Sequence, residues 1–329
     1  HARSRRACCA RRAIGCTSLV WRGVMSSSDR PVSGPLGPLV FFATAVVLVA
    51  GSGASCPNVI RGYQVGVMPL PRTLPAQPTR EQIIAAIEDN TSRVRSYAAT
   101  QAVLVVPGVP RLSAQVACEP PRRFRLRAQT SLTGNELDIG SNDDLFWLWI
   151  RRHDPPIMLF CEHEKYDQSS ARQVLPIRAE WMPELLGLVR FSPQHRHEGP
   201  FMTADGRLEI RSTIDSPDEQ LVRSIILHPM TGLVEEQHLF TSTGTRLASV
   251  RASRHRVDPG SGAALPRLID VSWPGSGIEF TLEVTSLVTN VPSTDPSQLW
   301  QMPAYDGYDP IDLADPSVVI NPAVTSPVQ

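Results

Sequence analysis

Apolar and polar side chains alternate in most segments between residues 99 and 287, a pattern typical of β-strands that pack one face against a core. In the clearest segment, Ile278, Phe280 and Leu282 share one face, and polar side chains occupy the other. The last third of the sequence predicts six strands, at residues 208–214, 221–228, 233–241, 246–257, 267–273 and 278–287. Turns rich in Gly, Pro, Ser and Thr separate them, which predicts an antiparallel meander with one apolar face.

An earlier set of strands is predicted at residues 99–106, 111–118, 122–130, 135–139, 144–151 and 157–161. Segment 144–151 differs from the others because both of its faces are apolar. Trp147 and Trp149 lie on one face, and Phe146 and Leu148 lie on the other. We therefore expect this strand to be covered on both sides.

Two segments have a helical pattern instead. Thr79 and Gln82 have the spacing of a capping box, and apolar residues recur at helical intervals from there to about Ser96. Residues 180–189 predict a short helix between the two sets of strands, with an apolar face formed by Trp181, Leu185, Leu186 and Leu188. Residues 163–178 and 192–200 lack a period and are expected to be loops. The fold class is therefore mainly β, with helices at two places (α+β).

Near the N-terminus, residues 39–56 form an apolar run that ends in small residues and Cys56. The sequence Gly-Ala-Ser-Cys at 53–56 resembles a bacterial lipobox, although Gly53 departs from the usual branched aliphatic residue. We interpret residues 1–24 as an extension of the gene model and 25–56 as a lipoprotein signal, with Cys56 as the lipidated residue. The alternative is an ordinary signal peptide cut near Ser55.

Composition divides the remainder of the chain. Residues 57–78 are rich in proline and are expected to be a tether, 79–302 form the folded domain, and 303–329 are rich in Asp and Pro and are expected to be disordered. Lys+Arg and Asp+Glu both number 32, and this balance argues against a nucleic-acid partner. Only Cys118 and Cys161 lie in the folded part, where they form either one disulfide or two separate buried thiols.

The sequence carries no catalytic signature. His153, His163, His195 and His197 lie in or near polar segments, two of them beside glutamates. They lack the spacing of an H-E-x-x-H motif, and the chain has neither a C-x-x-C pair nor a G-x-S-x-G elbow. We therefore expect no catalytic residue, no metal and no cofactor.

The order of elements, a signal, a helix, six strands, a helical insertion and six more strands, resembles the LolA/LolB-like family of periplasmic lipoprotein carriers and receptors, including planctomycete-type outer-membrane lipoproteins. The similarity spans residues 80–290 and is carried by the sequences at 121–127 and 140–147 and by Leu265-Pro266 and Trp273-Pro274. It implies a single incomplete antiparallel β-barrel of about 11–12 strands, with the N-terminal helix and the short helical insertion covering its open side.

The resemblance also implies partners and a location. Its members handle acyl chains of lipoproteins, so we expect a lipid ligand, a monomer, and a membrane contact through the anchor. The expected location is the cell envelope, lipid-anchored on the periplasmic side of the outer membrane, or the soluble periplasm if Cys56 is not lipidated. The alternative function is a protein-binding or envelope-stress-sensing module on the same fold.

An acyl-chain site would need an apolar sheet face that helices cover reversibly. The candidate residues share strand positions or the helical insertion, and they are Phe124, Leu126, Trp147, Trp149, Trp181, Ile269, Val271, Trp273, Ile278, Phe280 and Leu282. Each of these side chains also suits an ordinary protein core.

Overall fold

One long sheet dominates the computed structural model, which describes residues 69–151, 157–175, 178–215, 219–292 and 295–318. These residues belong to the unit formed by 64–329. The segments interpreted as gene-model extension and lipoprotein signal, and the tether up to residue 68, lie outside the described residues.

The first half of the sheet is a run of hairpins, with strands β1 (Tyr97–Val105), β2 (Leu112–Glu119), β3 (Arg123–Thr130), β4 (Gly134–Ser141), β5 (Leu145–Ile150) and β6 (Ile157–Glu162). The second half contains β7 (Arg196–Met202), β8 (Leu208–Asp215), β9 (Gln220–Leu227), β10 (Val234–Thr241), β11 (Arg246–Ser253), β14 (Leu268–Trp273) and β15 (Ile278–Thr289). A short 3-10 turn, η3 (Pro274–Ser276), connects the last two. All pairs between these strands are antiparallel, as the meander pattern predicts.

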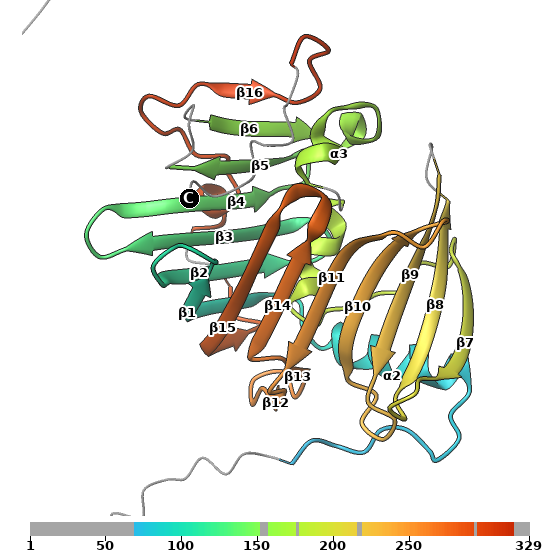
Figure 1. Cartoon of the computed structure of the whole chain (residues 1–329). Coiled ribbons are helices and arrows are strands. Elements are labelled where there is room, and N and C mark those ends of the chain that lie inside the picture. Colours follow the sequence, from blue (N-terminus) through green and yellow to red (C-terminus); the bar gives the residue numbers. More distant parts are fainter. Residues whose placement is uncertain (1–68, 152–156, 176–177, 216–218, 293–294, 319–329) are drawn as a thin grey trace, which may run out of the picture. The chain divides into compact units, whose positions relative to one another are not determined.

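The two halves join where β1 pairs with β15 as well as with β2. The sheet has 14 strands in the order β16-β6-β5-β4-β3-β2-β1-β15-β14-β11-β10-β9-β8-β7, and its two end strands do not pair with each other. Figure 1 shows the strands of the first half lying almost crosswise to those of the second half. The expected open, incomplete barrel is therefore confirmed, with 14 strands in place of the expected 11–12.

Helices cover one side of this sheet, called here the inner face, which carries Phe124, Leu126, Val271 and Leu282. Helix α2 (Arg80–Ser92) begins with the predicted capping box, in which Gln82 N donates to Thr79 Oγ1 at 3.3 Å and Thr79 N donates to Gln82 Oε1 at 2.9 Å. Its Ile83 and Ile87 are buried against apolar side chains of β8, β9 and β10.

The insertion between β6 and β7 covers the rest of the inner face (Figure 1). It consists of η1 (His163–Gln168), α3 (Ala171–Val174), η2 (Ala179–Trp181) and α4 (Met182–Leu185). Its buried apolar side chains belong to the same cluster as Phe124 and Val271. Helical structure here is broken into short turns, where the sequence predicted one helix over 180–189 and a loop over 163–178.

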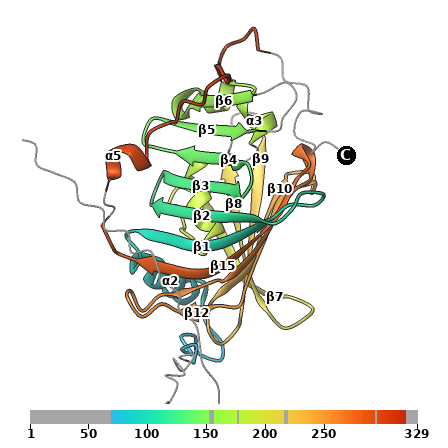
Figure 2. The same cartoon turned by 90° about the vertical axis from the view of Figure 1, so that its left-hand side faces the viewer.

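The C-terminal segment crosses the opposite, outer face. It contains α5 (Pro296–Leu299) and β16 (Pro310–Asp312), which pairs in parallel with β6. Figure 2 shows this segment passing in front of β5 and β6 on its way to β16. Residues 303–318 were expected to be disordered, and this expectation is wrong, because Tyr305 and Tyr308 pack against the tryptophans of β5.

Two smaller differences concern strands. Residues 192–200 were expected to be a polar loop, but those from Arg196 onward belong to β7 (Arg196–Met202), the edge strand of the sheet. Segment 246–257 ends as a strand at Ser253, and a separate two-stranded ladder of β12 (Arg256–Val257) and β13 (Ala264–Leu265) follows. Polar edge strands bury little, so their alternation is a weak signal.

Candidate functional site

Six of the predicted lipid-binding residues lie side by side on β14 and β15. The register places Ile269 opposite Leu282, Val271 opposite Phe280, and Trp273 opposite Ile278. Because paired residues of adjacent strands point to the same face, these three pairs form one apolar surface. Phe124 and Leu126 belong to the same buried cluster, so the structure brings eight of the predicted residues together on the inner face.

Trp147 and Trp149 lie on the outer face. Trp147 stands in register with Gly140 and Arg125, whereas Leu148 stands in register with Ile139 and Leu126. The two tryptophans form a separate cluster with Met158, covered by the C-terminal segment. They are therefore not part of the inner face. Both faces of β5 are apolar, so alternation could not decide which face carries the site.

Trp181 belongs to the insertion and is partly buried against the inner-face cluster. It lines a small inner cavity of about 40 Å³, together with Leu185, Leu239, Ala248, Val250 and Trp273. It also lines a larger hollow of about 380 Å³, bounded by Tyr166, Arg178, Ile214, Leu221 and Leu247 among others. The inner cavity has room for about one water molecule.

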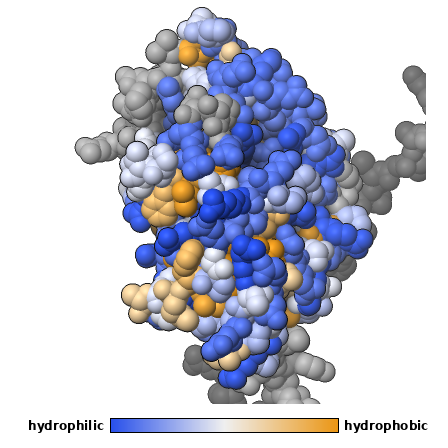
Figure 3. Space-filling model, turned by 90° about the vertical axis from the view of Figure 1, so that its right-hand side faces the viewer, coloured by the Kyte–Doolittle hydropathy of each residue, from blue (hydrophilic) through white to orange (hydrophobic). Residues whose placement is uncertain are grey.

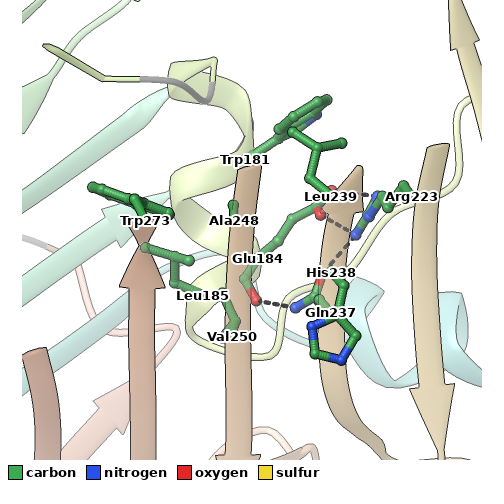
Figure 4. Close-up of a pocket in the computed structure, with 10 residues that line it drawn as sticks. All are labelled: Trp181, Glu184, Leu185, Arg223, Gln237, His238, Leu239, Ala248, Val250 and Trp273. Atoms are coloured by element: carbon green, nitrogen blue, oxygen red, sulfur yellow. Dashed lines mark hydrogen bonds and ion pairs between the residues drawn. The ribbon is translucent and has the colours of Figure 1, made fainter. Parts of the chain in front are cut away.

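Three polar side chains, Glu184, Arg223 and Gln237, line one side of the inner cavity (Figure 4). Arg223 on β9 forms an ion pair with Glu184 on α4, and both side chains are about one-tenth exposed. Arg223 Nη2 donates to Gln237 Oε1 at 2.7 Å, and Gln237 Nε2 donates to the backbone oxygen of Glu184 at 3.0 Å. These three side chains, called here the polar cluster, therefore link the insertion to strands β9 and β10.

Burial raises the pKa of Glu184 to about 7, and this effect outweighs the opposing influence of the nearby Arg223 and Arg190 guanidinium groups. The carboxyl group also accepts a hydrogen bond from the backbone nitrogen of Arg190 at 3.4 Å. The carboxyl group of Glu184 is therefore contacted from the insertion, by Arg190, and from the sheet, by Arg223.

The polar cluster was missed at the sequence level, although a signal was present. Arg223 is in phase with Leu221, Ile225 and Leu227 on its strand, so the alternation itself places a charged residue on the apolar face. A charged residue in such a position needs a partner. Gln237 has no comparable signal, because the polar residues around it blur the alternation of β10.

The two cysteines among the described residues, Cys118 and Cys161, are free thiols, and both are buried. Cys118 on β2 and Cys161 on β6 lie in the row that runs through Phe124, Ser141 and Phe146. Four strand spacings, about 19 Å along the sheet, separate them, whereas bonded cysteines need Cα atoms within about 7 Å. The structure therefore supports the alternative of two separate thiols.

Of the histidines considered as candidate ligands, His163 and His197 form hydrogen bonds with neighbouring protein groups. His197 contacts Ser212 Oγ at 2.8 Å and the Ser192 oxygen at 3.0 Å, and its ring lies 6.4 Å from that of His195. His163 contacts the Asn142 oxygen at 2.9 Å, and His153 lies outside the described residues. Within the described ranges, no three His, Cys, Asp or Glu side chains are grouped so that they could hold a metal ion.

The surface adds one residue that sequence reasoning missed. Leu132, at the tip of the hairpin between β3 and β4, is 94% exposed. On the side of the molecule that carries β7, the described residues are mostly hydrophilic, with hydrophobic ones in separate groups (Figure 3). None of the helices in the described part of the chain is long and apolar enough to cross a membrane.

No protein-family model and no curated protein matches this chain by sequence. Similar solved structures include a domain described as an outer membrane lipoprotein-sorting protein domain from Vibrio parahaemolyticus, with 9% identity and a TM-score of 0.45, covering 68% of this chain and 100% of that one. A DUF1329 family protein from Desulfovibrio piger has 10% identity and a TM-score of 0.43, covering 66% and 99%.

A LolA superfamily protein from Nitrosomonas europaea has 11% identity and a TM-score of 0.39, and the match covers 67% of this chain and 97% of that one. Two of these descriptions name proteins of the kind that the sequence resembles. At such identities the similarity concerns the fold alone.

Proposed function

We propose that this chain binds acyl chains, free or attached to lipidated proteins, on the inner face of its open sheet. The observation that carries the proposal is the cover of that face. An apolar sheet surface with paired residues such as Val271 and Phe280 is covered by an insertion whose helical pieces have only three to six residues.

Such a cover is easier to displace than the sheet beneath it. Isolated helices shorter than about 12 residues are marginal in water, so the insertion depends on its contacts with the inner face. The sheet, in contrast, is held by continuous ladders of backbone hydrogen bonds. An acyl chain offers the inner face the same kind of apolar contact that the insertion provides. Displacement would begin where packing is incomplete, at the cavity beside Trp181.

The setting that we propose for this activity is a bacterial cell envelope. Lipidation of Cys56 would anchor the chain on the periplasmic side of the outer membrane. The segment that begins at residue 57 would act as a tether as far as Thr73 and Leu74, whose backbone nitrogens donate to the Met230 oxygen at 3.1 Å. A chain cut at Ser55 without lipidation would instead act as a carrier in the periplasm. Catalysis is not part of the proposal, and the chain would act as a monomer without nucleic acid.

The test is saturable binding of N-phenyl-1-naphthylamine, an uncharged fluorescent reporter of apolar sites. We expect binding at about one molecule per chain, and weaker binding in Ala248→Phe, because Ala248 lines the inner cavity. Ala204→Phe is the matched control, since this alanine is exposed in the turn between β7 and β8. Binding that does not saturate, or that both variants leave unchanged, would contradict the proposal.

A second candidate function is binding of an extended peptide, and strand β7 favours it. β7 ends the sheet, and its Phe201 and Met202 are 39% and 69% exposed. A hollow of about 550 Å³ lies beside it, lined by Arg80, Ile84, Glu88 and His197 among others. An added strand would satisfy the free backbone groups of such an edge. Substituting Phe201 and Met202 by Ser should then abolish peptide binding and leave binding of N-phenyl-1-naphthylamine intact.

A further inference from the structure

The inner face carries one positive charge at a place where the cover is seated. Arg223 is in register with Leu239 on one side and Ser212 on the other, so its guanidinium lies on a surface that is otherwise largely apolar. The group is buried, and its residue is 8% exposed. A buried guanidinium needs an anion or several acceptors.

In the described structure the insertion supplies that anion. Glu184 receives both ends of the guanidinium, with Arg223 Nη1 3.5 Å from Oε1 and Nη2 paired with Oε2. Arg223 Nη1 also donates to the backbone oxygen of Arg190 at 3.2 Å. Two-pronged contact of this kind matches the shape of a carboxylate. Leu185 and Trp181 follow and precede this carboxylate on the insertion, and both line the inner cavity.

We propose that Arg223 and Gln237 form a binding site for the carboxylate head of a long-chain amphiphile, and that Glu184 occupies this site as an internal mimic while the insertion is seated. The inference rests on the proposed function, because it assigns a head-group position to the same inner face. In this comparison the carboxylate of Glu184 occupies the position of the ligand's head group. Trp181 and Leu185, which flank Glu184 and line the cavity, occupy the position of the first part of the acyl chain.

Displacement of the insertion explains why the ligand would be an acid. A neutral chain that replaced the insertion would leave Arg223 on an apolar surface without its anion, which is strongly unfavourable. A carboxylate restores the pair. Stability alone does not require the ion pair, since apolar residues of similar volume often replace a buried pair without loss.

A further hydrogen-bond donor lies at the same cavity. Trp273 lines the cavity and is 1% exposed, and its Nε1 has no hydrogen-bond partner among the described residues. Buried donors are normally paired, so an unpaired one beside a cavity indicates a place for an acceptor. Together with the amide of Gln237, it offers a carboxylate or an ester oxygen a second partner.

The test compares hexadecanoate with hexadecanol, which has the same chain and no charge, on the full chain at pH 8. We expect hexadecanoate to bind at least about tenfold more tightly. In the double variant Glu184→Leu/Arg223→Met, the preference should disappear while hexadecanol still binds, because the apolar surface remains. Glu184→Gln should keep the preference and bind hexadecanoate more tightly than wild type, since the competing carboxylate is gone.

Equal binding of the two ligands to wild type, or a preference that survives in the double variant, would overturn the head-group site and leave the proposed function standing. If neither ligand binds, the proposed function fails and the head-group site fails with it. Circular dichroism and thermal unfolding check that the double variant is folded.

If that variant does not fold, the head-group site is tested on the wild-type chain by the titration of the bound ligand. The carboxyl resonance of bound [1-¹³C]hexadecanoate should titrate at lower pH than in neutral detergent micelles. Both environments remove water from the carboxyl group, which raises its pKa, but only the site adds a guanidinium that stabilises the ionised form. A titration at equal or higher pH than in micelles would contradict the site.

Discussion

At the scale of single residues, the ionisation of Glu184 is strongly coupled to the fold. It is 7% exposed, and burial raises the pKa of its carboxyl group to about 7. In the unfolded chain the same group titrates near 4.5. The folded state therefore holds a proton on Glu184 over a range in which the unfolded state has released it.

The sign of the pH dependence follows from this difference. Between about pH 4.5 and 7 the folded state binds the extra proton, so the free energy of unfolding falls as the pH rises through this window and then levels off. Glu184→Gln removes this contribution, which amounts to at most about 3 kcal/mol. Urea denaturation at pH 5 and pH 8 should therefore show a smaller loss of stability with rising pH in the variant than in wild type.

Glu180→Gln is the control for that experiment. Glu180 lies on the same insertion, but its ion pair with Arg122, at 2.9 Å, is partly exposed, with side-chain exposures of 31% and 40%. We expect its pH profile to follow wild type. If Glu184→Gln also followed wild type, the burial of Glu184 in solution would have to be less complete than in this structure.

Residue patterns predicted part of this site. The pairs formed by β14 and β15 could be read from alternation, because each strand has one apolar and one polar face. The partner of Arg223 could not be read, because Glu184 lies in a short irregular segment whose orientation depends on the sheet that it covers.

At the scale of elements, the C-terminal segment is the least expected part of the fold. Asp138 on β4 is fully buried on the outer face and pairs with Arg125, with contacts of 3.1 and 2.7 Å. Trp147 Nε1 donates to the same carboxylate at 3.1 Å, and Tyr305 Oη donates to it at 2.8 Å. Arg125 Nη1 in turn donates to the backbone oxygen of Leu299 at 2.9 Å. The segment is thus held by a buried charge pair.

Removing one hydroxyl group tests this arrangement. Tyr305→Phe should lower the free energy of unfolding by about 1.5–3 kcal/mol, the usual range for a hydrogen bond to a charged group. Tyr308→Phe is the matched control, because its hydroxyl donates at 2.7 Å to the backbone oxygen of Arg151 in an exposed setting. Its loss should cost less than Tyr305→Phe. Urea denaturation measures both, and equal losses would speak against the buried pair as the anchor.

The sequence indicated that something must cover the outer face of β5, because that strand is apolar on both sides. It did not indicate what the cover is. The abundance of Asp and Pro after residue 302 suggested disorder. In the structure, however, Met302, Tyr305 and Tyr308 pack the segment against the cluster that contains Trp149. Tyr305 stacks on Trp149 with ring centroids 3.8 Å apart. The composition of a segment is an average over its residues, so it does not predict contacts that a few individual side chains make.

At the scale of the whole molecule, the hairpin between β3 and β4 presents Leu132 to solvent. A leucine that is 94% exposed gains about 1.5–3 kcal/mol if it enters a lipid layer. In a chain with Cys56→Ala, which removes the proposed anchor, Leu132→Glu should weaken binding to phosphatidylethanolamine and phosphatidylglycerol vesicles by about tenfold or more. Leu132→Phe should retain binding.

Vesicle flotation measures this effect, and thermal unfolding should be the same in both variants, since the side chain packs against little of the protein. Equal flotation of the Glu and Phe variants would show that this tip is not a membrane contact. The sequence did not mark Leu132, because a single apolar residue between turn residues has no periodic neighbours.

The meander was predictable from local patterns, and the way in which its halves join was not. Hydrogen bonds within a hairpin follow from short turns, but Asn290 Oδ1 accepts from Arg95 N at 2.7 Å across a separation of 195 residues. The open barrel was therefore predicted from the family resemblance. Alternation alone fits one long sheet as well as two separate ones.

The pairing of β1 with β15 has a consequence for how the chain folds. The hairpins of each half close over short loops, which costs little entropy and is fast. β1 must remain without its second neighbour until β15 is available, and β15 begins 173 positions after the end of β1 at Val105. Such distant contacts form slowly. The insertion lies in the sequence between the two halves, so it becomes enclosed only when they meet. We therefore expect assembly of the inner face to be a late event in folding, so that an amphiphile present at that moment would meet the surface before the insertion has closed over it.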